Sequence, residues 1–191
     1  MLNSKTIFAI ISLTIILFSF SFFSLLNDLS FYNKLFVENQ INSTKGIEIS
    51  VPLLNYFNNY SAEKPSIIHL NDEENIHMQE VKQIINKVKM FFVASILLFL
   101  ILIIFAEEKS KIFFYGGIFT ILLPLIIYVI PFEQLFILFH KTLFVGKWQF
   151  PAESVMIQTF SQQFFYNFAF WIFVRGMMFG GVVAVLSKLK N

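Results

Sequence analysis

The stretch from Asn71 to Ala106 decides the fold of this chain, and it reads NDEENIHMQEVKQIINKVKMFFVASILLFLILIIFA. Its first residues have the form of a helix start. The Asn71 side chain can accept from free backbone N–H groups, and Glu74 follows three residues later. Acidic residues also favour the positive end of the helix dipole. No Gly or Pro follows, and the sequence turns apolar from Met90. The pattern therefore predicts one helix that rises from water into a bilayer.

His77 lies near the start of this predicted helix. Val81, Ile84 and Val88 follow it at helical spacing and share its face. The spacing therefore predicts an ionisable imidazole on the apolar face of a helix, just outside the membrane.

The composition indicates an integral membrane protein. The chain has 191 residues, of which 57% are hydrophobic and 27 are Phe, and its mean hydropathy is +0.70. A soluble domain of this size does not need so much apolar surface. The net charge of +2 is too small and too evenly spread to favour nucleic acid as a partner. The chain has no Cys, which excludes disulfides, thiolate metal sites and a cysteine nucleophile.

Four apolar runs have the character of membrane spans, and they cover residues 7–26, 90–106, 112–130 and 164–186. A cleavable signal peptide is the rival interpretation of the first run. That run exceeds a normal signal-peptide core, and no small-x-small cleavage site follows it. We therefore expect an uncleaved first span, and residues 1–191 to form a single membrane domain. Gly116 and Gly117 in the third span permit close helix approach.

Residues 27–89, between spans one and two, mix polar and apolar character. The first element expected there is a helix with Phe31, Tyr32, Leu35 and Phe36 on one face, which would lie on the membrane surface or cover the second span. The others are a turn over Asn42–Gly46, a short helix over Val51–Tyr60 that begins with Pro52, and a loop over Ser61–Pro65.

Residues 131–163, between spans three and four, begin with an apolar helical pattern. Phe132–Val145 predicts a helix ended by Gly146. That helix is too short to cross a membrane and too apolar for water, so we expect it to lie in the interface or to be re-entrant. Pro151 is expected to start another short helix that leads into span four.

Four spans put both termini on one side of the membrane. The short segments on that side hold five lysines in 16 residues, against eight lysines in the 96 residues of the two long segments. This density favours cytoplasmic termini. The sequence therefore predicts an all-α, multi-pass protein of the cell membrane. It has four transmembrane helices, an extracytoplasmic helical cap and an interfacial or re-entrant helix between spans three and four.

This topology brings two histidines to the same, outer side. His77 precedes span two and His140 follows span three, and only Glu107–Lys111 separates these spans, so they form a tight hairpin. Their outer ends are neighbours, and we expect the two imidazoles to meet there. One interfacial histidine usually bridges water and apolar packing, but two on apolar faces at one end of a hairpin favour a site. His69, in the preceding loop, is expected to be solvated.

Few other residues indicate chemistry. The chain has no HExxH motif and no G-x-S-x-G turn, so neither a metal site nor a serine nucleophile is predicted. Two bases without a nucleophile suit a substrate that brings its own. Arg175 in span four costs about 2.5–3.5 kcal/mol to insert, so either a ligand or a structural partner must hold it. Lys82 and Lys141 can lower the histidine pKa values or anchor lipid headgroups, or can face water, which we favour for Lys141.

Two motifs carry a family resemblance. His77-Met78-Gln79-Glu80-Val81-Lys82 resembles an HM-x-(D/E)-V-K signature, and Phe139 to Trp148, followed by Phe164-Phe165, resembles an F-H-x-x-x-F…W…FF pattern. Both are typical of the lipoprotein intramolecular transacylase family of small four-span bacterial membrane proteins. The chain departs from the family at Phe150, where an Asp is usual, and at Ser161-Gln162, where a Pro is usual.

The resemblance implies an enzyme that acts on a diacylglyceryl-cysteine lipoprotein with a free α-amine. It would move the sn-2 acyl chain to that amine and give the lyso-form lipoprotein, without cofactor or metal. The resemblance and the shared membrane side make His77 and His140 the candidate acid–base pair at the extracytoplasmic face. Lys82, Trp148 and Arg175 are candidates for substrate contact. The expected partners are the diacylated lipoprotein and membrane lipid.

Two alternatives stay open on the sequence. One is a non-catalytic membrane protein whose outer cap binds a lipid or protein partner. The other is a metal-dependent membrane hydrolase, in which two histidines and one carboxylate would hold the metal.

Overall fold

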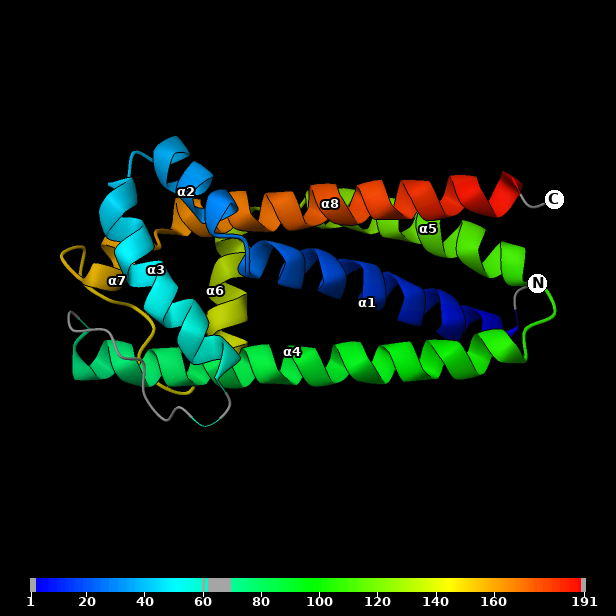
Figure 1. Cartoon of the computed structure of the whole chain (residues 1–191), viewed down its shortest axis with the longest axis horizontal. Coiled ribbons are helices and arrows are strands. Elements are labelled where there is room, and N and C mark those ends of the chain that lie inside the picture. The colour runs from blue at the N-terminus through cyan, green and yellow to red at the C-terminus, as the bar shows by residue number, and fades with distance from the viewer. Residues whose placement is uncertain (1–2, 60, 62–69, 190–191) are drawn as a thin grey trace. The chain divides into compact units, whose positions relative to one another are not determined.

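A computed structural model describes residues 3–59, 61 and 70–189. All regular secondary structure in these residues is helical, and Figure 1 labels the helices in chain order. The helices are α1 Ser4–Leu26, α2 Leu29–Glu38, α3 Ser43–Asn58, α4 Asp72–Ile104, α5 Lys109–Ile127, α6 Phe132–Leu143, α7 Val155–Thr159 and α8 Gln162–Leu189.

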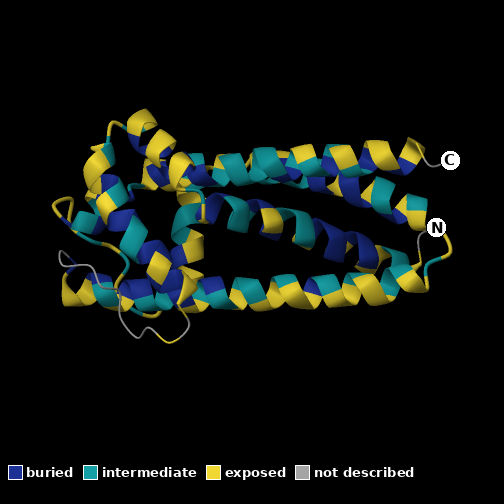
Figure 2. Cartoon of the chain, viewed as in Figure 1, coloured by how far each residue is buried: buried dark blue, intermediate teal, exposed yellow. Residues whose placement is uncertain are grey.

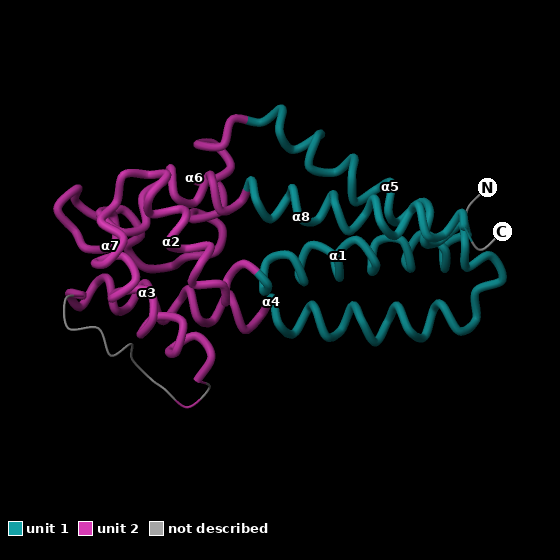
Figure 3. The backbone as a smooth tube through the Cα atoms, turned by 45° about the horizontal axis from the view of Figure 1, so that its top comes forward, with its two compact units in different colours: residues 1–24, 88–130, 170–191 teal, residues 25–87, 131–169 magenta. Residues whose placement is uncertain are grey.

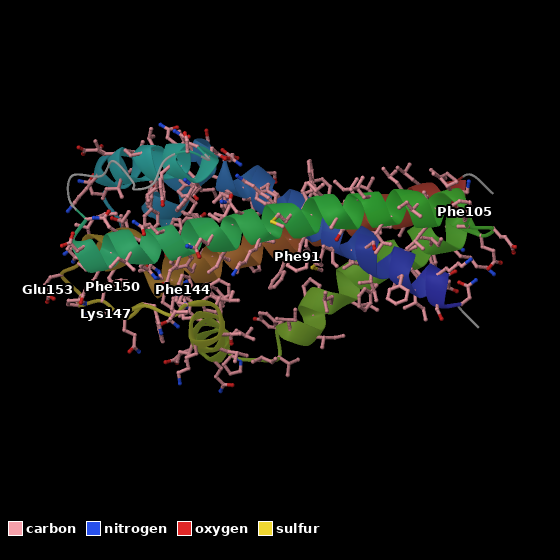
Figure 4. All side chains as sticks on the ribbon, turned by 90° about the horizontal axis from the view of Figure 1, so that it is seen from below. Phe91, Phe105, Phe144, Lys147, Phe150 and Glu153 are labelled. Carbon is pink, nitrogen blue, oxygen red and sulfur yellow. The ribbon has the colours of Figure 1, made fainter. Side chains whose placement is uncertain are left out.

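Among the described residues, α1, α4, α5 and α8 are the helices long and apolar enough to cross a membrane. They match the four predicted spans in order and confirm the all-α integral membrane fold. In the apolar part of α4, from Met90 to Ile104, Ser95 is buried and the other residues are exposed or half-buried inside the protein (Figure 2). Phe91 on α4 and Phe105 directly after its end, both labelled in Figure 4, are exposed. Apolar side chains left uncovered along a helix of this length are what lipid tails would cover.

The stretch from Asn71 to Ala106 forms a single helix, as predicted, although α4 ends at Ile104. The Asn71 side chain accepts from the Glu74 backbone N–H at 2.9 Å, and the Glu74 carboxylate accepts from the Asn71 N–H at 2.9 Å. This reciprocal pair is a capping box. It satisfies two backbone donors that a helix start leaves free, so it fixes where α4 begins.

The chain divides into two compact units, coloured in Figure 3. The first comprises the described parts of residues 1–24, 88–130 and 170–191. Within it Thr120 is fully buried and contacts Thr14 through their hydroxyl groups at 3.2 Å. A Cβ atom on Gly117 would overlap the carbonyl oxygen of Gly180, so α5 and α8 touch backbone to backbone there. Small residues allow such close packing between membrane helices.

The second unit comprises the described parts of residues 25–87 and 131–169. Its core is aromatic: the Phe36 ring of α2 stacks on the Phe164 ring of α8, with centroids 5.5 Å apart. Tyr32 lies 5.8 Å from the same Phe164 ring. The aromatic face of α2 is therefore buried, but its partner is α8, the fourth span, and not the membrane surface or the second span as predicted. The prediction of a single membrane domain over 1–191 stays a prediction.

The predicted turn at Asn42–Gly46 is wrong, because α3 already begins at Ser43. The Asn42 side chain caps it by accepting from the Lys45 N–H at 3.1 Å. Gly46 is buried, and a Cβ there would overlap the ring of Phe36. The glycine therefore serves the packing of two helices rather than a turn, and Pro52 lies inside α3 instead of starting it.

Two further helix boundaries differ from the prediction. α6 ends at Leu143, before the expected Val145. Pro151 does not start a helix, because α7 begins at Val155, where the Ser154 side chain accepts from the Ile157 N–H at 3.1 Å. The predictions for His69 and for the loop after Ser61 fall outside the described residues.

Candidate active site

The first turns of α4 position His77. Glu74 is 1% exposed, and its second carboxylate oxygen accepts from the backbone N–H of Met156 in α7 at 3.2 Å. The start of α4 is thus held from two directions. His77 follows one turn later and is itself 7% exposed. His77 therefore lies in a part of α4 that cannot unwind unless Glu74 loses its hydrogen bonds to the backbone N–H groups of Asn71 and Met156.

His140 lies in the last turn of α6 and is the one buried residue of that helix. Its ring Nδ1 lies 2.7 Å from the backbone carbonyl oxygen of Phe136. A carbonyl only accepts hydrogen bonds, so Nδ1 must carry the hydrogen and donate it. In the neutral ring, Nε2 therefore holds the lone pair that can accept a proton.

The structure brings the two imidazoles together. Their ring centroids lie 6.2 Å apart and their planes are within 16° of parallel. The Phe144 ring lies 4.5 Å from His77 and 5.0 Å from His140, so it touches both. Trp148 lies 4.9 Å from His140, and Phe150 lies 5.5 Å from His77. The segment after α6 thus surrounds the pair with aromatic rings, and Figure 4 labels Phe144 and Phe150 on it.

Burial sets the charge state of both rings. Both rings lie outside the apolar spans. His77 precedes Met90, where the apolar part of α4 starts, and His140 lies between the third and fourth spans. The pKa of His77 is lowered from 6.5 to about 4: burial is the largest cause, the like charge of His140 also lowers the pKa, and the Glu80 carboxylate raises it. Burial also lowers the pKa of His140, and its hydrogen bond to Phe136 opposes this. Both imidazoles are therefore neutral near pH 7 and can accept a proton.

We expect NMR of isotope-labelled histidine to report these shifts. The chain has only three histidines, so His69→Gln and His140→Gln assign the signals. Because its pKa is lowered, His77 should stay neutral as the pH falls from 6.5 and should titrate near pH 4. In His140→Gln the His77 midpoint should rise, but not to 6.5, since burial is the larger cause. A wild-type midpoint at or above 6.5 would contradict this account of the site.

The other predicted site residues lie in different places. Trp148 joins the histidine pair. Lys82 is buried, and its ammonium donates to the Asn59 carbonyl at 2.6 Å and lies 4.2 Å from the centre of the Tyr56 ring. Arg175 belongs to the other compact unit, where its guanidinium donates to the Ser24 hydroxyl at 3.0 Å. The structure thus brings Trp148 to the histidines, while these contacts of Lys82 and Arg175 are with other groups.

The sequence places Glu80 and Phe144 in the two motifs without a role for Phe144, leaves open whether Glu80 tunes His77 or faces water, and offers Phe150 only as a departure from the family pattern. The Phe139-to-Phe144 spacing was a usable signal for Phe144. For Glu80 the only local signal was its position three residues after His77. Its partners are residues 145 and 146, far along the chain, and no sequence period connects them.

The fold and the site together define a class: a multi-span membrane protein with two neutral, buried imidazoles equipped for acid–base chemistry. The sequence profile of lipoprotein intramolecular transacylase Lit matches residues 7–165. The chain belongs to the lipoprotein intramolecular transacylase family, an enzyme family of the membrane, as its two motifs predicted. Comparison with curated proteins gave no match.

Solved structures show the same fold. The membrane-integral lipoprotein intramolecular transacylase Lit from Bacillus cereus superposes with a TM-score of 0.82 at 21% identity, over 97% of this chain and 93% of that one. A variant of the Bacillus cereus protein with a histidine replaced by alanine gives a TM-score of 0.82 at 20% identity, over 97% and 91% of the two chains. A variant with a histidine replaced by arginine gives 0.80 at 20% identity, over 97% and 89%.

Proposed function

We propose that this protein moves the sn-2 acyl chain of a diacylglyceryl-cysteine lipoprotein to the α-amino group of the same molecule, giving the lyso-form, with His77 and His140 as the acid–base pair. The observation that carries the proposal is the pairing of two buried, neutral imidazoles with ring centroids 6.2 Å apart. Family membership supplies the substrate class.

The bonds and protons of this transfer balance without a co-reactant. A C–N bond forms between the amine and the acyl carbonyl carbon, and the ester C–O bond to glycerol breaks. An imidazole takes the proton that the attacking amine loses, and the protonated histidine pair returns one proton to the glycerol oxygen as it leaves. An imidazole N–H can also stabilise the oxyanion of the tetrahedral intermediate. The protein is unchanged at the end, and the product is an isomer of the substrate.

The residues present suit this reaction. The nucleophile and the acyl donor belong to one molecule and meet through a ring of about eight atoms, so positioning supplies much of the rate enhancement. An α-amine has a pKa of about 7.7–8.0 and is mostly protonated near neutral pH, so a base is needed. Either ring of the pair can be that base, and in His140 the atom that would accept is Nε2, because Nδ1 is held by the Phe136 carbonyl.

Apolar surface beside the site suits a lipid-bearing substrate. On and just after α6, Leu138 and Phe139 are exposed, and Val145 is 98% exposed. Exposed apolar side chains next to a buried polar pair fit acyl chains attached to a polar headgroup. Trp148, packed on His140, is the candidate contact for the glycerol end. We place the site at the extracytoplasmic face of the cell membrane with both termini cytoplasmic, on the lysine density.

A label-crossover experiment tests the reaction. Purified protein is mixed with two diacylated lipopeptides that have free α-amines. One is unlabelled, and the other carries heavy isotopes in both its sn-2 chain and its peptide. Mild alkali then removes ester-linked chains, and mass spectrometry reads the amide-linked chain that remains. We expect light chains only on light peptides and heavy chains only on heavy peptides.

Each other outcome contradicts the proposal. Mixed products would indicate transfer between molecules, and released fatty acid would indicate a hydrolase. Lipopeptide that binds but keeps both esters would indicate a non-catalytic binding protein. Activity abolished by a chelator and restored by a metal would indicate metal-dependent chemistry.

A further inference from the structure

Glu80 joins the two segments that carry the histidines. It lies one turn after His77 on α4, on the same face. Its Oε1 accepts from the backbone N–H groups of Val145 at 3.1 Å and Gly146 at 2.9 Å. These residues follow directly on α6, which carries His140. Hydrogen bonds to an ionised carboxylate are among the stronger ones in proteins, so one oxygen atom ties the segment directly after α6 to α4.

The other carboxylate oxygen of Glu80 is also informative. Glu80 Oε2 is buried without a hydrogen-bond partner, and so is Nδ1 of His77. A Cβ on Gly146 would lie 3.2 Å from Oε2, so the segment after α6 closes tightly over the carboxylate. A buried carboxylate oxygen left without a donor is costly and calls for a reason. Glu80 Oε2 is a negative acceptor, and His77 Nδ1 lies one helical turn away on the same face of α4. Each of these two atoms therefore explains why the other is buried without a partner.

We propose that Glu80 is the positioning residue of the histidine pair. Its Oε1 sets the place of His140 relative to His77, and its Oε2 is the counter-charge for the His77 ring when that ring takes a proton during the transfer. This inference rests on the proposed function. It extends it from two residues to three, in the way that a buried carboxylate orients a catalytic histidine in other enzymes.

The charges around His77 make this role specific. The charged or titratable groups that act on its ring are Glu80 on its own helix and His140 on α6. The neighbours from the following segment, Phe144 and Phe150, are uncharged. The Glu80 charge favours protonated His77, whereas His140 opposes it. Removing the carboxylate therefore leaves His77 with only unfavourable influences on its charged form.

The substitution Glu80→Gln separates geometry from charge. The amide carbonyl oxygen can still accept from Val145 and Gly146, but the negative charge is gone. We expect kcat to fall by about 10- to 100-fold with little change in KM. The acid limb of the pH–rate profile and the NMR midpoint of His77 should both move to lower pH. Glu80→Asp keeps the charge on a shorter side chain, so it should leave the direction of the His77 shift unchanged while loosening residues 145 and 146.

Glu73→Gln is the matched control. Glu73 also ties α4 to the same segment, through an exposed ion pair with Lys147 at 2.6 Å, but it acts on neither imidazole. Its activity should stay within about 2-fold of wild type. Glu80→Gln with unchanged kcat would overturn the proposal, and a lower kcat with an unchanged pH profile and His77 midpoint would overturn the role of the charge. A wild-type protein that leaves the lipopeptide unaltered would instead overturn the proposed function, while the His77 midpoint in Glu80→Gln still decides whether the two side chains are coupled.

Discussion

Replacing either histidine with Ala is expected to lower lyso-form production by about 10²- to 10⁴-fold, the usual contribution of a general acid–base group. In His140→Ala the pair loses the imidazole that the Phe136 carbonyl orients. In His77→Ala the second ring of the pair is missing. The transfer within one molecule should continue slowly in both variants, because positioning by the rest of the site remains.

The measurement is the initial rate of alkali-resistant N-acyl lipopeptide formation at saturating substrate. Lys141→Ala is the matched control for His140→Ala, because this neighbouring side chain on the same helix is exposed. It should keep nearly full activity. The double variant should be little slower than either single variant, because groups that act as one unit have non-additive effects. Near-normal rates in either single variant would remove that histidine from the mechanism.

The parts of this fold that the sequence predicts are those that local physics decides. The capping box at Asn71 and Glu74 needs only residues three apart, and each membrane span needs only a long enough apolar run. The meeting of His77 and His140 required one further step, the short link that makes a hairpin of spans two and three. That step uses topology alone, without knowledge of side-chain packing.

The parts that the sequence does not predict depend on contacts between distant segments. Gly46 looks like a turn residue until the ring of Phe36 is found against it. Glu80 looks like one more acid on a solvated face until the backbone N–H groups of Val145 and Gly146 are found on its oxygen. Both residues have common alternative roles, and only the partner decides between them. The pattern of a single sequence does not contain that partner.

Glu74→Ala is expected to be the most destabilising single change near the site. The carboxylate is 1% exposed and accepts from two backbone N–H groups, at Asn71 and at Met156. Without it, the buried Met156 N–H and the part-buried Asn71 N–H both lose their acceptor, and a cavity remains. A buried donor left unsatisfied costs about 1–3 kcal/mol and a part-buried one costs less, because water can reach it, so the free energy of unfolding should fall by roughly 2–4 kcal/mol. The free energy of unfolding of Glu74→Gln should lie between those of the wild type and Glu74→Ala. Its amide oxygen can accept from one N–H group, while its NH₂ group faces the other.

The neighbouring residue gives the control for this prediction. Glu73→Ala removes an exposed ion pair with Lys147, which is worth about 0–1 kcal/mol. Thermal unfolding in detergent ranks the variants, and hydrogen exchange locates the damage. Faster exchange in Glu74→Ala should be confined to the first turns of α4 and to α7. Because His77 stands one turn beyond the cap, activity should fall with the same variant even below its unfolding temperature. Equal stability of Glu73→Ala and Glu74→Ala would mean that the start of α4 is held by apolar packing, and that the capping box contributes little to the placement of His77.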